Sequence, residues 1–305
     1  MRMENLEQAY QESLDFIYSF IDFSMKRHLD DSHRFFKLDR MRHMMGLLGN
    51  PQEKFLTIHV AGTKGKGSTA SLCASALRAA GYKVGLYTSP HLQEFTERIQ
   101  INGAQIERQA LVDLVARIRP LTAQVPEITT FELMTVLAFL HFFESRVNIA
   151  VVEVGLGGRL DATNIITPLV SVITPISYDH TAILGNTLTE IAFEKGGIIK
   201  AGVPVVISPQ NPEAERELVR IAAERGSPLT RVEQEYRLSI LSHSLRGQEL
   251  AFAARTGDPA CARSLACPEL NVHLPLLGAH QAQNARTALG ALDQVRAQEI
   301  GRAQV

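Results

Sequence analysis

Apolar residues recur along this chain with spacings typical of helices in some stretches and of strands in others. Residues 4–22 carry apolar side chains at Leu6, Tyr10, Leu14, Ile17 and Ile21, which is the spacing of one helix face. By the same criteria, with glycine and proline as stop signals, further helices are predicted at 38–48, 68–77, 107–119, 130–144, 187–195, 212–225 and 278–296. Apolar runs predict strands at 55–60, 84–88, 149–154, 169–173 and 203–207.

This order of elements indicates an α/β fold. Strands that alternate with helices favour a mostly parallel sheet flanked by helices. The segment near 229–275 is less regular and suits a small, strand-rich part made of short strands.

A glycine-rich loop joins the predicted strand at 55–60 to the helix that follows it. The loop reads Gly62, Thr63, Lys64, Gly65, Lys66, Gly67 and Ser68. Strand, loop and helix in this order form a phosphate cradle, because the loop N–H groups and the helix N-terminus converge on one anion. Lys66 would reach terminal phosphate oxygens, and the Ser68 hydroxyl would bind Mg²⁺.

The spacing of this loop departs from the common G-x-x-x-x-G-K-[ST] pattern. Gly67 separates Lys66 from Ser68, and Val60 stands where the first glycine should fall. This spacing is wrong for a generic kinase or GTPase.

Polar residues follow three other predicted strands, at the points where those strands end. Ser89 comes after the second strand, Glu153 closes the third, and Asp179 and His180 follow the fourth. Ligands of parallel sheets bind at the carboxyl ends of the strands. Together with the glycine loop, these clusters predict one site at this edge of the sheet.

Three of these side chains have both a functional and a structural interpretation. Glu153 ends a strongly apolar strand, so it binds a cation there or else pairs with Arg159 or caps a helix. His180 is a poor Mg²⁺ ligand by hardness and is equally well explained as a packing or capping residue. Lys195 either satisfies carbonyls at a helix C-terminus or is a desolvated amine that takes up carbon dioxide as a carbamate.

Bulk composition fits an ordinary soluble enzyme of the reducing cytoplasm. The 305 residues have a formal net charge of −1, so no broad field attracts nucleic acid or an anionic membrane. The 3 cysteines form no C-x-x-C pair, which argues against a disulfide framework or a zinc site, and Cys73 is expected to be a packed thiol. The N-terminus has no apolar signal core.

The polar clusters, in this order, resemble the folylpolyglutamate synthase and dihydrofolate synthase family within the Mur ligase superfamily. The resemblance covers the chain from about 38 to 290 and rests on seven segments, namely 59–68, 87–92, 97–103, 153–164, 179–185, 194–200 and 277–284. The resemblance implies a P-loop NTPase-like Mur ligase central domain. It also implies ATP-dependent addition of L-glutamate to dihydropteroate or to a reduced folate through an acyl phosphate.

The resemblance also implies roles for residues of this chain. The loop residues, with Lys66 and Ser68, would serve the phosphates of ATP, and Asn284 would meet the adenine. Ser68, Ser89, Glu153 and His180 would hold Mg²⁺. Lys195 would be carbamylated beside the second metal, and Asp161, with Arg159 in the same segment, would lie on the folate side. Lys66, Lys195 and His180 are the expected catalytic residues.

Length is the main departure from that family, whose members usually have a further C-terminal α/β domain. We expect residues 1–296 to form the ATP-binding domain with its N-terminal helices, 297–305 to form a polar tail, and the glutamate-ligase domain to be absent. The chain would then be a monomer, or be completed by a separate C-terminal domain. A catalytically incomplete nucleotide-binding remnant and another Mur-type ligase are the alternatives, and the relative preference for dihydropteroate and folylpolyglutamate stays open.

Overall fold

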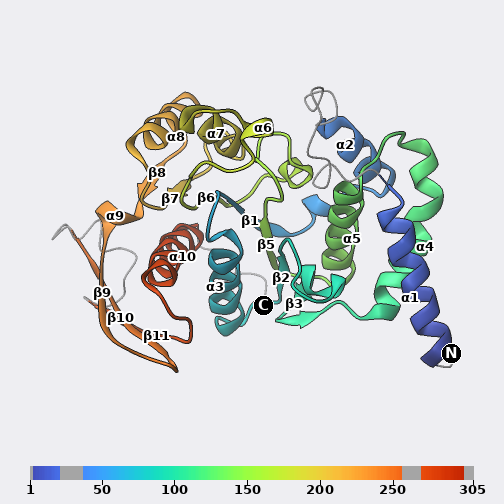
Figure 1. The fold of residues 1–305 in the computed structure, drawn as a ribbon, viewed down its shortest axis with the longest axis horizontal. Coiled ribbons are helices and arrows are strands. Elements are labelled where there is room, and N and C mark those ends of the chain that lie inside the picture. The colour runs from blue at the N-terminus through green and yellow to red at the C-terminus, as the bar shows by residue number, and fades with distance from the viewer. Residues whose placement is uncertain (1–2, 21–36, 256–268, 299–305) are drawn as a thin grey trace.

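The structure, a computed structural model, describes residues 3–20, 37–255 and 269–298 (Figure 1). Its α-helices are α1 Met3–Tyr18, α2 Leu38–Leu47, α3 Lys66–Ala79, α4 Arg108–Ile118, α5 Thr130–Glu144, α6 Thr181–Leu184, α7 Leu188–Gly196, α8 Pro212–Glu224, α9 Val232–Glu235 and α10 Ala279–Ala297. Its strands are β1 Leu56–Ala61, β2 Val84–Tyr87, β3 Ile99–Ile101, β4 Ala104–Gln105, β5 Ile149–Glu153, β6 Val170–Ile173, β7 Val205–Ile207, β8 Leu229–Arg231, β9 Tyr236–Ser244, β10 Gly247–Ala254 and β11 Leu270–Leu274. Cys261, Cys267 and most of the predicted polar tail lie outside the described residues.

An eight-stranded sheet in the order β4-β3-β2-β5-β1-β6-β7-β8 forms the centre of the molecule. The six strands from β2 to β8 in this order pair in parallel, and β3 and β4 extend one edge in antiparallel pairing. The predicted mostly parallel sheet is therefore confirmed. Val60 lies opposite Glu153 in the register of β1 and β5, so the end of β5 lies beside the start of the glycine loop.

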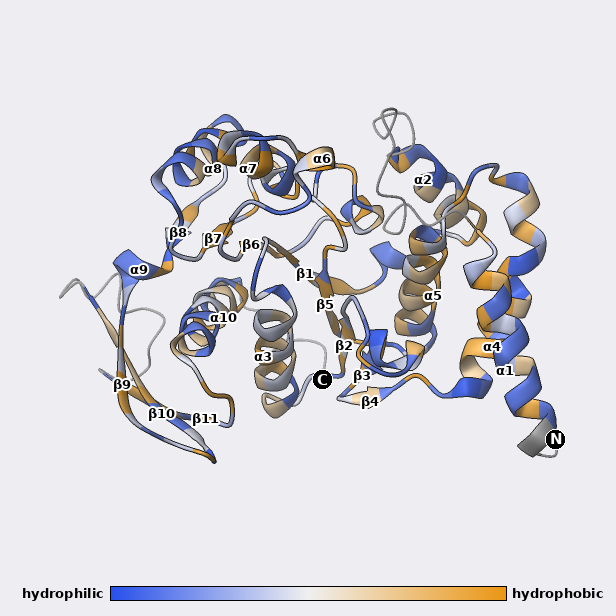
Figure 2. Ribbon diagram, in the orientation of Figure 1, coloured by the Kyte–Doolittle hydropathy of each residue, from blue (hydrophilic) through white to orange (hydrophobic). Residues whose placement is uncertain are grey.

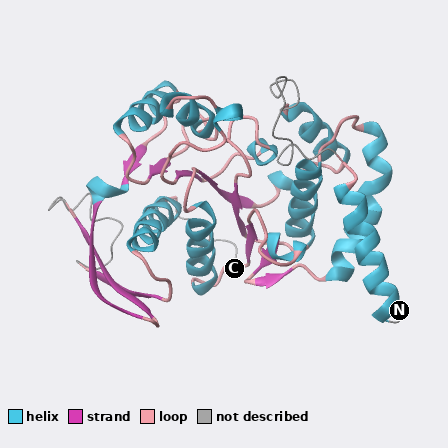
Figure 3. Cartoon of the chain, viewed as in Figure 1, coloured by secondary structure: helices cyan, strands magenta, loops and turns pink. Residues whose placement is uncertain are grey.

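Helices cover both faces of the sheet and bury the alternate residues of its central strands (Figure 3). Helices α3 and α10 pack on one face, against residues such as Ile58 of β1 and Val151 of β5. On the other face, α5 packs with α1, α2 and α4 over Ala150 and Val152, while α7 and α8 cover Ile173 of β6. Helix α5 is coloured mainly as hydrophobic in Figure 2, in keeping with its burial between the sheet and the N-terminal helices.

A second, three-stranded antiparallel sheet, in the order β11-β10-β9, lies beside α10 (Figure 1). Its inner residues Leu250, Phe252 and Leu274 pack against Ala282 of α10. The strand-rich segment predicted near 229–275 is thus confirmed, although β9 has 9 residues and is longer than the short strands expected there.

Most predicted boundaries agree with the structure to within two residues. The helix predicted at 4–22 ends earlier, at Tyr18, and residues 21–22 lie outside the described residues. Two of the differences of two residues have local causes. The helix after the glycine loop begins at Lys66 rather than Ser68, because Gly65 adopts a left-handed conformation at its N-cap. Strand β7 begins at Val205 rather than Val203, since Pro204 has no N–H to donate to a ladder. In the part of the chain that the structure describes, no helix is long and apolar enough to cross a membrane.

Candidate active site

The glycine loop leaves β1 at Ala61 and turns tightly before α3. The N–H groups of Thr63 and Lys64 both donate to the Pro175 carbonyl, at 3.0 and 3.3 Å, which ties the loop to the segment after β6. Gly65 has φ +82°, and a Cβ there would lie 2.3 Å from Oδ1 of Asn284. Only glycine therefore allows both this backbone conformation and the close approach of α10.

A cavity of about 450 Å³ opens beside this loop. The loop from Thr63 to Ser68 lines it, and so do Ser89 and Glu153. Glu153 lies close to the loop, because a Cβ on Gly67 would be 3.3 Å from its Oε2. Three of the four predicted metal ligands, Ser68, Ser89 and Glu153, thus border a single cavity together with Lys66. These residues are far apart in the sequence, because each lies at the end of a different strand or just after it.

Glu153 is a buried carboxylate at the end of β5, with only 4% of its surface exposed. Its Oε2 accepts the Ser89 backbone N–H at 3.1 Å. Burial raises the pKa of Glu153 to about 7, and the nearby Lys66 opposes that shift. The alternative pairing with Arg159 is wrong, because the Arg159 guanidinium instead pairs with Glu194, at 2.8 Å. A desolvated carboxylate with this little compensation suits a bound cation.

Lys195 lies in the last turn of α7, but its side chain turns back to the glycine loop. The Nζ donates to the Gly62 carbonyl at 3.0 Å, and the side chain is buried. The interpretation of Lys195 as a cap for its own helix carbonyls is therefore wrong. Desolvation, helped by the charge of Lys66, lowers the pKa of Lys195 to about 8. A buried amine with a lowered pKa is neutral more often than an ordinary lysine at neutral pH.

His180 is placed less centrally than the other predicted ligands. It adopts a left-handed conformation at φ 48° before α6, and its side chain is half exposed, with Nε2 at 3.8 Å from Oδ1 of Asp179. His180 is not among the residues that line the cavity. The charge of Asp179 partly opposes the lowering of the Lys195 pKa, so Asp179 lies within electrostatic reach of Lys195. The role of His180 as a metal ligand stays a prediction.

The two residues predicted for the folate side have local partners. Asp161 is buried and accepts the N–H groups of Leu156 and Thr163 at 2.8 and 3.0 Å, together with the Thr163 hydroxyl. Arg159 pairs with Glu194 and lies 5.4 Å over the ring of Phe193. Both therefore hold the loop after β5 in place, and their contact with a folate stays a prediction.

Asn284 reaches the site from α10, far from the loop in sequence. Its side chain is buried, its Nδ2 donates to Oε1 of Gln281 at 3.0 Å, and its Oδ1 abuts Gly65. The structure thus brings Asn284 to the glycine loop, while its predicted contact with adenine remains to be tested.

A buried polar chain beneath the site was missed by the sequence analysis. His59, on β1, is fully buried, and its Nε2 lies 2.8 Å from the Thr163 hydroxyl, which in turn donates to Asp161. Desolvation lowers the pKa of His59 to about 3, so the ring is neutral. Because the Thr163 hydroxyl donates its proton to Asp161, we assign the ring proton to Nε2, which then donates to Thr163. A histidine within an apolar strand just before the glycine loop was the only sequence signal for it.

The fold and the site define a nucleotide-binding α/β domain with a ligase-type phosphate loop, and comparison with known proteins gives its family. Residues 60–292 match the family described as the Mur ligase middle domain. Dihydrofolate synthase/folylpolyglutamate synthase of Bacillus subtilis is 37% identical over 298 residues, covering 96% of this chain and 65% of its own length. The chain belongs to the Mur ligase family, in the branch of the folylpolyglutamate and dihydrofolate synthases.

Solved structures agree with this assignment. Folylpolyglutamate synthase from Thermotoga maritima superposes with a TM-score of 0.80 at 32% identity, over 95% of this chain and 63% of that one. A folylpolyglutamate synthase complex with AMPPCP and folate gives a TM-score of 0.82 at 36% identity, over 95% and 68%. The Mycobacterium tuberculosis enzyme complexed with ADP gives 0.81 at 33% identity, over 96% and 63%. The chain thus spans about two thirds of the length of these relatives.

Proposed function

We propose that this chain is the ATP-using part of an amide ligase that adds L-glutamate to dihydropteroate, to reduced folate (poly)glutamates, or to both. The observation that carries the proposal is the cavity that the glycine loop, with Lys66 and Ser68, lines together with Ser89 and Glu153. The named relatives are folylpolyglutamate and dihydrofolate synthases, and one of them is a complex with an ATP analogue and folate. We infer that the reaction takes place in the cytoplasm, uses small-molecule substrates and involves neither nucleic acid nor a membrane.

The donors at this cavity fit Mg²⁺. Hydroxyl and carboxylate oxygens are the ligands that this ion prefers, and Glu153 is a buried carboxylate whose Oε2 accepts the Ser89 N–H. Ser68, Ser89 and Glu153 would hold the ion, with His180 as a further candidate. When bound, Mg²⁺ supplies positive charge that offsets the repulsion between the triphosphate and the attacking carboxylate.

The chain's own groups would then direct two steps. The substrate carboxylate attacks the terminal phosphorus of ATP and ADP leaves, with Lys66 and the loop N–H groups stabilising the charge of the transferred phosphoryl group. The amine of L-glutamate next attacks the acyl carbon, inorganic phosphate leaves, and an amide bond remains. Asn284 would position the adenine, and Asp161 with Arg159 would shape the folate side of the cavity.

Lys195 would add a negative group to the site as a carbamate. With a pKa of about 8, roughly a tenth of its amines are neutral at pH 7 and able to react with carbon dioxide. The reaction forms an N–C bond and releases the amine proton. The remaining N–H can still donate to Gly62, so the hydrogen bond at 3.0 Å survives the modification.

Phosphate release from ATP tests the proposed function. The purified chain is incubated with Mg²⁺, ATP, L-glutamate and either dihydropteroate or tetrahydrofolate, and each component is omitted in turn. Release that requires both co-substrates supports a ligase and shows which acceptor it prefers. ATP binding without such release would support instead a binding remnant, or a monomer that requires a separate C-terminal domain. Absence of nucleotide binding would overturn the proposal.

A further inference from the structure

The segment that carries Ser89 has no regular secondary structure of its own. Residues 88–94, here called the Ser89 segment, run from the end of β2 to the short 3₁₀ helix at Phe95–Arg98. Thr88, Ser89, Pro90 and Leu92 of this segment border the cavity. Something outside the segment must therefore hold it in position.

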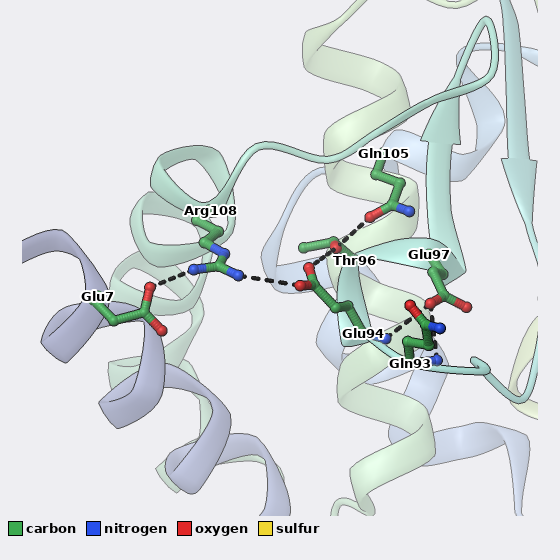
Figure 4. A network of polar contacts seen from close by, with 7 residues as sticks. All are labelled: Glu7, Gln93, Glu94, Thr96, Glu97, Gln105 and Arg108. Atoms are coloured by element: carbon green, nitrogen blue, oxygen red, sulfur yellow. Dashed lines mark hydrogen bonds and ion pairs between the residues drawn. The ribbon is translucent and has the colours of Figure 1, made fainter. Parts of the chain in front are cut away.

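The Glu97 carboxylate accepts three hydrogen bonds from the backbone of that segment. Its Oε2 accepts the N–H of Leu92 at 2.7 Å, and its Oε1 accepts the N–H groups of Gln93 and Glu94 at 2.9 and 2.8 Å. Figure 4 shows Glu97 directed at Gln93 and Glu94. These bonds to a charged acceptor lower the pKa of Glu97, the Leu92 N–H most of all.

Three further contacts fix the other parts of the Ser89 segment. Arg98 donates from Nε to Nδ1 of His91 at 2.8 Å, and its carbonyl accepts the Thr88 N–H at 3.0 Å. The Ser89 N–H donates to Oε2 of Glu153 at 3.1 Å. The segment is thus bonded at its far end to Glu97 and at its near end to Glu153. A shift at Leu92 would be carried through two residues to Ser89, because Pro90 restricts the backbone between them.

An outer ion-pair chain touches the same segment but is weak. Arg108 bridges Glu7 of α1 and Glu94, with its Nη2 3.3 Å from Oε1 of Glu94 (Figure 4). The Glu94 side chain is 52% exposed, and exposed ion pairs contribute little. Glu94 itself is joined to Glu97, because the two form a capping box in which each side chain accepts the backbone N–H of the other. Glu7, at the outer end of the ion-pair chain, therefore offers the matched control: its side chain is 60% exposed and pairs with Arg108.

We propose that Glu97 is a positioning residue, which holds the Ser89 segment so that Ser89 and Glu153 face the glycine loop in one arrangement. This inference rests on the proposed function in assuming that Mg²⁺ and nucleotide bind at that cavity. Glu97 also lines the cavity, but its two carboxylate oxygens are engaged by backbone donors. Its action is on the segment rather than on substrate.

Nucleotide binding with a Mg²⁺ titration tests the inference, using AMPPCP with the wild type, Glu97→Gln and Glu7→Gln. In Glu97→Gln an amide nitrogen, which cannot accept a hydrogen bond, replaces one carboxylate oxygen. Half-maximal binding of AMPPCP should then need about ten-fold more Mg²⁺, while its affinity without metal should change by less than about two-fold. Glu7→Gln should match the wild type, because it removes an exposed ion pair. Thermal unfolding of each variant establishes that it is folded, and Glu97→Asp serves if Glu97→Gln is not. An unchanged Mg²⁺ midpoint in a folded Glu97 variant would overturn the inference.

The same substitution in a Ser89→Ala background separates positioning from general weakening. If Glu97 acts through Ser89, its replacement should have little further effect on the Mg²⁺ midpoint once the Ser89 hydroxyl is gone. Fully additive effects would contradict that route.

Amide hydrogen exchange tests the positioning without any ligand. Exchange at Leu92, Gln93 and Glu94 should accelerate in Glu97→Gln, and so should exchange at Ser89, whose N–H bonds Glu153. Unchanged exchange at Ser89 would overturn the inference. If the wild type does not bind Mg²⁺ and nucleotide but Ser89 responds as expected, the proposed function fails while the positioning role stands.

Discussion

Replacing Thr163 by valine tests the buried chain that joins β1 to the loop after β5. Thr163 is fully buried; its hydroxyl lies 2.8 Å from Nε2 of His59 and donates to Asp161. Valine keeps the β-branched shape but removes both bonds. Loss of the first bond leaves the His59 N–H without a partner, and loss of the second removes a donor from the buried Asp161 carboxylate.

The expected loss of stability follows from those two bonds. An unsatisfied buried donor costs about 1–3 kcal/mol, and a hydrogen bond to a charged group contributes about 1.5–3 kcal/mol. We expect a destabilisation of about 3 kcal/mol, which is a fall of about 6 °C in Tm at the scale of large domains. Urea unfolding, followed by circular dichroism and compared at equal m-value, measures it.

Thr69 supplies the matched control. It is also fully buried, but its hydroxyl has no hydrogen-bond partner among the described residues. Thr69→Val removes an unsatisfied polar atom and should be neutral or stabilising. The reasoning is refuted if Thr163→Val lies within about 0.5 kcal/mol of the wild type, or if both variants lose stability equally.

Four further predictions concern the site. Lys195→Ala should abolish glutamate addition and leave some nucleotide binding, whereas near-normal turnover would end the carbamate proposal. Glu153→Gln should weaken the Mg²⁺ dependence of ATP use, and an unchanged Mg²⁺ titration would remove Glu153 from the metal site. Gly65→Ala places a Cβ 2.3 Å from Oδ1 of Asn284 and should abolish AMPPCP binding, while Gly81→Ala, with φ +94° and open space, should bind normally. Folding lowers the pKa of Lys195 from 10.5 to about 8, so its contribution to stability is full above pH 10.5 and is lost as the pH falls through 8. Relative to Lys195→Met, the wild type should therefore gain about 3 kcal/mol between pH 8 and 10.5, and a constant difference in urea midpoint would contradict the shift.

The glycine loop shows how far sequence alone predicts a site. Its strand, glycines and helix are adjacent in the chain, so local backbone preferences suffice to predict the phosphate cradle. The rule that ligands bind at the carboxyl ends of parallel strands then places Ser89 and Glu153 near it. The structure brings both to the cavity that the loop borders.

Side-chain direction was much harder to predict. The same residues allowed Glu153 to pair with Arg159 and allowed Lys195 to cap its own helix, and the structure shows neither. Each alternative was chemically reasonable, because an ion pair or a cap is available to any charged residue at such a position. The packing of α7 against the sheet decides both cases, because it places Glu194 beside Arg159 and the Lys195 amine beside the Gly62 carbonyl.

The sequence by itself therefore determined most of the elements, though not β3, β4 or α6. It also determined the parallel arrangement of the central strands and the phosphate loop, because helix and strand periodicities and glycine conformations are local properties. Tertiary structure alone decided that the Lys195 amine reaches Gly62, 133 residues away, and that His59 meets Thr163, 104 residues away. Burial at these long-range contacts sets the pKa values of Lys195 and His59. Desolvation depends on every atom packed around a group, so no local pattern in the chain encodes it.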